Sequence, residues 1–273
     1  MLRWIAMLFA AAAVCAQTGA PATAEGWLEQ GKRQFAAKQL DEATQSFEQV
    51  LQLDPRNSEA RVGLADVSLQ RWLKARDGEE RLRFYFQARN LLVGVLEQEP
   101  DNKKALRGIA RLSYLGRSSA PGQDKDAWLD EARRWNLRLV EVDPQEPSGH
   151  FALGVLAWTK CVSPDGNSRG KAGMTGAEDG PIPDATVRSE YREACRPTVE
   201  EGTAQLEQAV ALRPDEATYL RYLAQLLRMR ADYADTPEAA RPDLELARQM
   251  EAKAQKAVSS QPSAVSHSGS ADR

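Results

Sequence analysis

Near its N-terminus, the chain places small and large side chains at the spacing of two antiparallel helices, and a proline follows them. Gly31 and Ala43 are small enough to let two helix backbones approach, and the large side chains of Trp27 and Phe47 fill the space opposite. Pro55 stands where the second helix must end, because proline lacks an amide hydrogen and clashes with the preceding turn. The pattern therefore predicts a helical hairpin.

The second half of this pattern returns along the chain, each time ending in a proline. The later copies are Ala88, Leu92 and Pro100, then Ala132 and Pro144, then Leu206 and Pro214. Glycines that would allow close helix approach recur in the first helices, at Gly63, Gly108 and Gly154. Runs of β-branched residues bounded by turn residues, which would predict strands, are nearly absent. We expect five helical hairpins, over residues 25–55, 57–100, 102–144, 147–213 and 215–258.

These residues resemble the tetratricopeptide repeat (TPR), a helical hairpin of about 34 residues. The first copy meets the repeat pattern W-x2-L-G-x2-Y…A-x3-F…P at five of its seven positions, with Gln30 and Gln34 in place of the leucine and the tyrosine. The chain is similar to exported bacterial TPR proteins over about residues 24–258. The resemblance implies an all-α, right-handed α-solenoid, one elongated domain over residues 25–258, that binds a peptide or partner helix on its concave face.

The first residues have the order of a secretory signal peptide. Arg3 precedes the apolar run at residues 4–14, and small residues follow it. This run is too short for a stable membrane span. We expect cleavage after Ala16, which removes residues 1–16, with cleavage after Ala24 as the alternative. The mature protein is then exported to the periplasm or cell envelope and has no transmembrane helix.

Cys15 supports a different interpretation of the same segment, in which it is the acylated first residue of a lipoprotein. Such sites usually have leucine three residues before the cysteine and glycine, alanine or serine directly before it. Ala12 and Val14 stand at those positions. We therefore predict plain export and keep a lipid anchor at Cys15 as the alternative.

Removal of the signal peptide leaves Cys161 and Cys195, an even count in a compartment that favours disulfides. Aligned to the repeat, Cys161 falls just past the first helix of the fourth hairpin, and Cys195 just before the repeat-like part of the second helix. Antiparallel packing would bring both to the same turn, so we expect a disulfide that closes an insertion at residues 161–195. The alternative is a pair of unbonded thiols. Pro197 predicts a kink or break in the helix that starts near Ala185.

The enclosed residues 162–185 are rich in glycine, proline, aspartate, serine and lysine, and are the least repeat-like stretch of the folded region. The segment from Gly166 superficially resembles a phosphate-binding loop. It is one residue short, however, and Ala172 replaces the required serine or threonine. We interpret the stretch as a loop that contacts a partner or is merely tolerated.

Residues that could form a catalytic site are scarce. The two histidines are His150, beside Phe151 near the start of a helix, and His267, in the serine-rich residues 259–273. That tail has too little apolar surface to fold and is expected to be disordered. Cysteine–histidine zinc spacing is absent. We therefore predict no catalytic, cofactor-binding or metal-binding residues and a protein that is not an enzyme.

Charge is nearly balanced at −3, yet residues 69–117 carry eleven lysines and arginines against six acidic residues, with aromatic residues interleaved. A basic, aromatic surface there would receive an acidic segment of a protein, and Arg81, Arg83 and Arg89 are its candidate partner-binding residues. The alternative places the aromatics in the core and the arginines on a solvated face, with their stems covering apolar surface. Nucleic acid is not expected as a partner at this net charge.

The sequence thus predicts a protein-interaction scaffold of the bacterial envelope, which binds an unidentified protein or peptide through its concave TPR surface. One alternative is an outer-membrane assembly lipoprotein tethered through Cys15. The less favoured one is a small-ligand binder that uses the insertion at residues 162–185.

Overall fold

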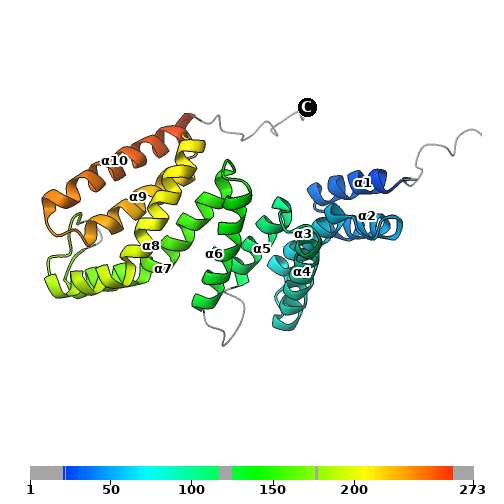
Figure 1. The fold of residues 1–273 in the computed structure, drawn as a ribbon, viewed down its shortest axis with the longest axis horizontal. Coiled ribbons are helices and arrows are strands. Elements are labelled where there is room, and N and C mark those ends of the chain that lie inside the picture. Colours follow the sequence, from blue (N-terminus) through cyan, green and yellow to red (C-terminus); the bar gives the residue numbers. More distant parts are fainter. Residues whose placement is uncertain (1–20, 22, 117–124, 176–177, 261–273) are drawn as a thin grey trace, which may run out of the picture. The chain divides into compact units, whose positions relative to one another are not determined.

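The chain is all-α, and its helices pair into consecutive hairpins (Figure 1). The computed structural model describes residue 21 and residues 23–116, 125–175 and 178–260, and these contain ten helices and no strand. The hairpins are α1 (Ala24–Ala36) with α2 (Leu40–Leu53), α3 (Ser58–Lys74) with α4 (Gly78–Gln98), α5 (Lys103–Gly116) with α6 (Lys125–Val142), α7 (Pro147–Lys171) with α8 (Ala185–Leu212), and α9 (Ala217–Asp232) with α10 (Pro237–Ser260). The predicted all-α solenoid of five helical hairpins is confirmed.

The helices fall into two compact units, which we describe separately. Unit 1 contains α1 to α4 and ends at Pro100. Unit 2 starts at Asp101 and contains α5 to α10.

The connections between hairpins share one turn, built around the predicted stop prolines. These exposed prolines are Pro55, Pro100, Pro144 and Pro214. Two residues after each, a polar side chain accepts a hydrogen bond from an amide in the first turn of the next helix, as Asn57 Oδ1 does from the Ala60 amide at 2.9 Å. The other such residues are Asn102, Glu146 and Glu216. Each side chain satisfies an amide that the helix itself leaves unpaired.

The core of unit 1 centres on Phe47 of α2, whose side chain is 2% exposed. A Cβ atom added to Gly31 of α1 would lie 2.8 Å from its ring, and one added to Gly63 of α3 would lie 2.6 Å from it. The ring thus fits because glycine stands on both neighbouring helices. Ala43 is fully buried in the same cluster, and Trp27 packs half-buried at its edge.

The later repeat positions also lie in the core. Buried at these positions are Ala88 and Leu92 in unit 1, and Ala132 and Leu206 in unit 2. A Cβ atom added to Gly154 of α7 would overlap Leu206 Cγ of α8, and one added to Gly202 of α8 would overlap the Ala157 Cβ. The fourth hairpin therefore also packs small residues against larger ones.

The fourth hairpin differs from the sequence prediction in the length of its helices, since α7 has 25 residues and α8 has 28. Cys161 lies inside α7, so the expectation that it falls beyond the helix end was wrong. α7 continues through Pro164 to Lys171, and only residues 172–184 connect the two helices. Of the predicted kink or break at Pro197, the break was wrong, because α8 runs through this residue. An internal proline costs about 3 kcal/mol, which the packing of α8 against α7 and α9 offsets.

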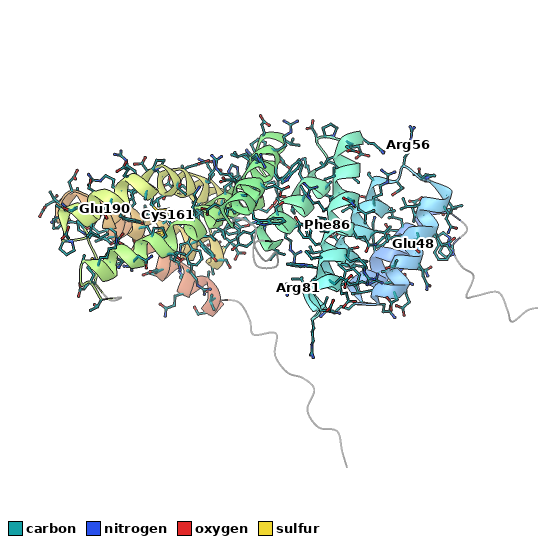
Figure 2. The ribbon with its side chains drawn as sticks, turned by 90° about the horizontal axis from the view of Figure 1, so that it is seen from below. Glu48, Arg56, Arg81, Phe86, Cys161 and Glu190 are labelled. Atoms are coloured by element: carbon teal, nitrogen blue, oxygen red, sulfur yellow. A yellow bond between two sulfur atoms is a disulfide. The ribbon has the colours of Figure 1, made fainter. Side chains whose placement is uncertain are left out.

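The structure joins Cys161 of α7, which Figure 2 labels, to Cys195 of α8 in a disulfide. Their Cα atoms lie 5.9 Å apart. Both side chains are buried in the core of unit 2. The bond therefore connects the interiors of two packed helices rather than the neck of a loop.

Several predictions fall on residues outside the described part of the chain. These are the signal peptide at residues 1–16, the anchor at Cys15, His267 and most of the tail at residues 259–273. The first two tail residues, Ser259 and Ser260, belong to α10. None of the described helices is long and apolar enough to span a membrane.

Candidate functional site

Aromatic side chains collect on one face of unit 2, where α7 and α9, the first helices of the last two hairpins, contact each other. Phe151 stacks on Tyr219 with ring centroids 4.5 Å apart and meets Tyr222 edge-on at 5.6 Å. Trp158 meets Tyr222 edge-on at 5.4 Å. We call these four residues the aromatic face. Phe151, Trp158 and Tyr222 are half-buried, so parts of these rings stay open to solvent.

A cavity of about 520 Å³ continues the aromatic face toward the C-terminal ends of α7 and α9, and Trp158 lines it too. The remaining lining residues are Val162, Asp165 and Arg169 of α7, Gln225, Arg228, Met229 and Asp232 of α9, Leu244 of α10, and Glu178 and Asp179 of the connection before α8. One end of the site is thus aromatic and the other charged.

Arg169 holds the connection between α7 and α8 against α9. Its Nη1 donates to Asp232 Oδ1 at 2.7 Å, and both side chains are largely buried. Its Nη2 donates to the carbonyl oxygens of Thr175 and Glu178 at 3.2 and 2.5 Å. The Ile182 amide donates to the Asp232 carbonyl oxygen at 2.9 Å. These bonds fix the described part of the connection as one wall of the cavity.

Arg228, the second arginine of the cavity, also forms ion pairs with carboxylates. It pairs with Asp179 and, at 2.9 Å, with Glu251 of α10. Arg248 of α10 pairs with Asp179 at 3.2 Å. Burial acts to raise the pKa of Asp179, but the hydrogen bonds from Arg228 and Arg248 outweigh it and lower that pKa below its ordinary value.

Asp165 lines the same cavity and forms no ion pair within 4 Å in the described part of the chain. Its Oδ1 is buried and accepts no hydrogen bond from any described group. Burial raises the pKa of Asp165 above its ordinary value. Burial, and then the negative charge of Asp165, raise the pKa of Asp232 to about 8. The two carboxyl groups therefore hold a proton between them at a higher pH than an ordinary aspartate does.

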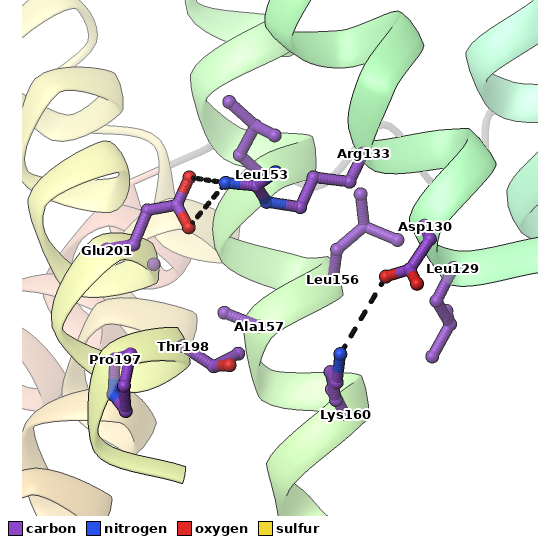
Figure 3. Close-up of a pocket in the computed structure, with 11 residues that line it drawn as sticks. Leu129, Asp130, Arg133, Leu153, Leu156, Ala157, Lys160, Pro197, Thr198 and Glu201 are labelled. Atoms are coloured by element: carbon purple, nitrogen blue, oxygen red, sulfur yellow. Dashed lines mark hydrogen bonds and ion pairs between the residues drawn. The ribbon is translucent and has the colours of Figure 1, made fainter. Parts of the chain in front are cut away.

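A second pocket of about 280 Å³ lies among α6, α7 and α8 (Figure 3). Its apolar walls include Leu129, Leu153, Leu156 and Ala157. Arg133 Nη2 donates to both oxygens of Glu201 at 2.6 and 2.8 Å, and Lys160 lies 3.7 Å from Asp130 (Figure 3). Because these charges satisfy one another, this pocket offers a ligand little beyond apolar contact.

The arginines that the sequence singled out, Arg81, Arg83 and Arg89, lie on α4 of unit 1, where Figure 2 labels Arg81. The guanidinium group of Arg81 lies 5.2 Å from the Trp72 ring centroid, and that of Arg83 lies 4.9 Å from the Phe84 ring centroid. Both rings are buried. These two arginines therefore cover core aromatics, as the alternative expected.

The surface of α4 also exposes apolar side chains. Phe86 is 53% exposed, and Leu82, one turn earlier, is 39% exposed. Arg83 lies between them in sequence and pairs weakly with Glu80 at 3.6 Å. The role of Arg81, Arg83 and Arg89 in partner binding stays a prediction.

His150 of α7 is a packing residue. It is 6% exposed, with Nδ1 2.7 Å from Gln205 Oε1 and Nε2 3.0 Å from the Pro144 carbonyl oxygen. Both ring nitrogens are thus engaged in joining α7 to α8 and to the preceding turn. Within the described ranges, no group of three or more His, Cys, Asp or Glu side chains is placed to hold a metal ion.

Comparison with known proteins supports the helical-repeat class. The family model of the tetratricopeptide repeat matches residues 34–71. The structure of residues 41 to the end of MamA from Desulfovibrio magneticus RS-1 is similar over 90% of this chain and 100% of that chain, with 15% identity and a TM-score of 0.53. A further MamA crystal structure is similar over 85% of this chain and 94% of that chain, with 11% identity and a TM-score of 0.52.

The structure of TTC0263, a thermophilic TPR protein of Thermus thermophilus, has 18% identity and a TM-score of 0.49, over 85% of this chain and 98% of that chain. At 11% and 15% identity, the likeness to the two MamA structures shows the fold alone. No curated protein sequence matches the chain. Residues 34–71 thus match the tetratricopeptide repeat, and the chain folds into consecutive helical hairpins.

The aromatic face and Asp165 were not predicted from the sequence. Phe151 and Trp158 are seven residues apart and Tyr219 and Tyr222 three apart, so each pair shares one side of its helix. That spacing was the available signal. It predicts a shared face, but not whether the face meets the core or solvent.

Proposed function

We propose that this protein is an exported interaction scaffold of the bacterial envelope and that its aromatic face binds an extended peptide of a partner protein. The TPR fold supports the general role, because first helices of stacked hairpins present a continuous binding surface. The observation that carries the choice of surface is the partial exposure of Phe151, Trp158 and Tyr222, together with the cavity that Trp158 lines.

The aromatic face suits peptide binding for two physical reasons. Aromatic residues carry much of the binding energy at interfaces, because they bury large areas with few rotatable bonds. The rings of Phe151, Trp158 and Tyr222 are also held by mutual contacts before any partner arrives. Such preorganisation lowers the entropy cost of binding.

Export rests on the order of residues 1–16, and the Cys161–Cys195 disulfide is consistent with an oxidising compartment. Cell fractionation followed by measurement of the intact protein mass tests the proposed export. Plain export predicts an envelope protein that begins at Gln17, or at Glu25 with the alternative cleavage, and acylation at Cys15 would add the mass of lipid. An unprocessed protein in the cytoplasm would contradict both versions.

Selection of random peptides displayed on phage tests the binding surface. The bait is the mature protein, compared with Trp158→Ala and with the control Phe86→Ala, which removes an exposed aromatic from unit 1. We expect the wild type and the control to enrich the same peptides and Trp158→Ala to lose them. Peptides lost only by the control would move the site to unit 1, and the absence of enriched peptides would refute peptide binding.

A further inference from the structure

Resting on the proposed function, we propose that the partner peptide carries an acidic side chain, which pairs with Arg111 of α5 while an aromatic or apolar side chain of the same peptide contacts the aromatic face. The occupant is thus an acidic segment of a protein with an apolar anchor, and Arg111 is a residue that determines its specificity.

Arg111 lies on the side of α5 that faces α7. Arg107, one turn earlier, donates from Nη2 to Glu146 Oε2 at 3.1 Å, directly before the start of α7. Tyr114, one turn later, has its hydroxyl oxygen 3.5 Å from Thr159 Oγ1 of α7. Because residues three and four apart share one side of a helix, Arg111 lies between two contacts that both reach α7.

The repeat places Arg111 at the level of the aromatic face. The helices α5 and α7 both start at the third residue after their stop proline, so corresponding positions can be counted from the two starts. By this count Arg111 corresponds to Val155, which lies between Phe151 and Trp158 on α7. Tyr114 corresponds to Trp158 itself, in agreement with its contact to the residue that follows Trp158.

The guanidinium group of Arg111 is available to a carboxylate. Its side chain is exposed, and it forms no ion pair or hydrogen bond with any group in the described ranges. The acidic residues just before α7, Asp143 and Glu146, pair with Lys103 and Arg107 at 2.6 and 3.1 Å. A carboxylate of the partner would therefore meet an arginine that it need not separate from another acid.

The charge of the neighbouring helices favours an acidic occupant. Residues 147–164 of α7 and 217–231 of α9 contain no acidic residue. The helix α5 contains none either, and its basic residues are Lys103, Lys104, Arg107 and Arg111. Charge complementarity therefore selects an acidic segment over a basic one, and a carboxylate pairs with a guanidinium group through charge-assisted hydrogen bonds.

The spacing along α7 predicts the spacing in the peptide. Phe151 and Trp158 are seven residues apart on one helix, which corresponds to about 10 Å at about 1.5 Å per residue. An extended peptide rises about 3.3 Å per residue, so this distance spans about three residues. Because Arg111 corresponds to a position between the two rings, we expect the acidic residue within about two positions of the apolar anchor.

The composition of the selected phage peptides gives the first test. Peptides that need Trp158 for binding should be enriched in aspartate and glutamate, relative to the unselected library, beside an aromatic or apolar residue. With Arg111→Gln as the bait, this enrichment should disappear. The control Arg134→Gln, which removes an exposed arginine from α6, the second helix of the same hairpin, should keep it.

Isothermal titration calorimetry gives the second test, on the tightest-binding Trp158-dependent peptide and on versions with its acidic residue replaced by glutamine or lysine. Blocked termini exclude recognition of a terminal carboxylate. The wild type and Arg134→Gln should bind the acidic version about fivefold more tightly than the glutamine version, Arg111→Gln should not discriminate, and Arg111→Glu should prefer the lysine version. The discrimination should shrink as the salt concentration rises from about 0.05 to about 0.5 M.

The outcomes separate this inference from the proposed function. Trp158-dependent peptides without an excess of acidic residues, or equal affinity of the wild type for the acidic and glutamine versions, would overturn the role of Arg111 and leave peptide binding intact. Loss of discrimination in Arg134→Gln as well would also overturn it, because any arginine of unit 2 would then have the same effect. If the library yields no Trp158-dependent peptide, the proposed function fails and the inference fails with it.

Discussion

Two glycines of α7 should respond in opposite ways to the same substitution. A Cβ atom added at Gly154 would overlap Leu206 Cγ, the branch carbon of a fully buried side chain on α8. A Cβ atom added at Gly166 would meet no atom within 4 Å. Gly166→Ala is therefore a control for Gly154→Ala on the same helix.

The magnitudes follow from helix propensity and packing. Alanine is more favourable than glycine inside a helix by about 1 kcal/mol, so Gly166→Ala should stabilise unit 2 by up to this amount. At Gly154 the same gain is offset by overpacking, which typically costs about 1–3 kcal/mol and more when a branch carbon is in the way. The net expectation is a destabilisation of up to about 2 kcal/mol.

Thermal unfolding followed by circular dichroism measures the difference, with the Cys161–Cys195 bond kept oxidised in every sample. In a unit of this size, 1 kcal/mol shifts the midpoint by about 2–4 °C. Adding Leu206→Ala to Gly154→Ala should cost less than the sum of the single changes, because the truncation relieves the overlap. Equal stability of the two glycine variants would refute the packing of α7 on α8.

Further predictions concern the core, the helix caps and the buried carboxyl pair. Phe47→Ala should destabilise unit 1 by about 3–5 kcal/mol in denaturant unfolding, and a loss well below 1 kcal/mol would contradict its central place. Asn57→Ala should lower the free energy of unfolding by about 1 kcal/mol in the same assay, because the Ala60 amide of α3 loses its acceptor. An unchanged midpoint would contradict the role of Asn57 as a helix cap. The pKa of Asp232 is raised from 3.8 to about 8, so the wild type should lose stability relative to Asp232→Asn as pH rises through this range in thermal unfolding. If the stability of the two proteins changed with pH in the same way, Asp232 would not retain a proton in the folded state.

The hairpin fold could be predicted because its signals are local. A small residue opposite a large one, as with Gly31 and Phe47, indicates how two helices pack. A proline after the second helix indicates where that helix ends. The length of α7 could not be read this way. Its last turns contain Gly166 and Gly170 and look like a loop, but Arg169 pairs with Asp232 on α9, and such tertiary contacts override a weak local propensity.

The site was harder to predict from the sequence, because it depends on which side chains pair with one another in the folded structure. Nothing local shows that Arg169 pairs with Asp232 rather than with Asp165, four residues away on its own helix. The basic run at residues 69–117 illustrates a different limit, since it crosses the division at Pro100 between the two units. A charge count over such a run combines residues of two separate units.

Photo-crosslinking most directly tests the claim that the protein binds partners through the aromatic face. A library-selected peptide that carries a photoreactive group would be irradiated with the mature protein, and the attachment sites read by mass spectrometry. We predict attachment to α7 and α9 around Trp158, and its loss in Trp158→Ala. Attachment confined to α3 and α4 around Arg81 would contradict the account and favour the basic surface of unit 1.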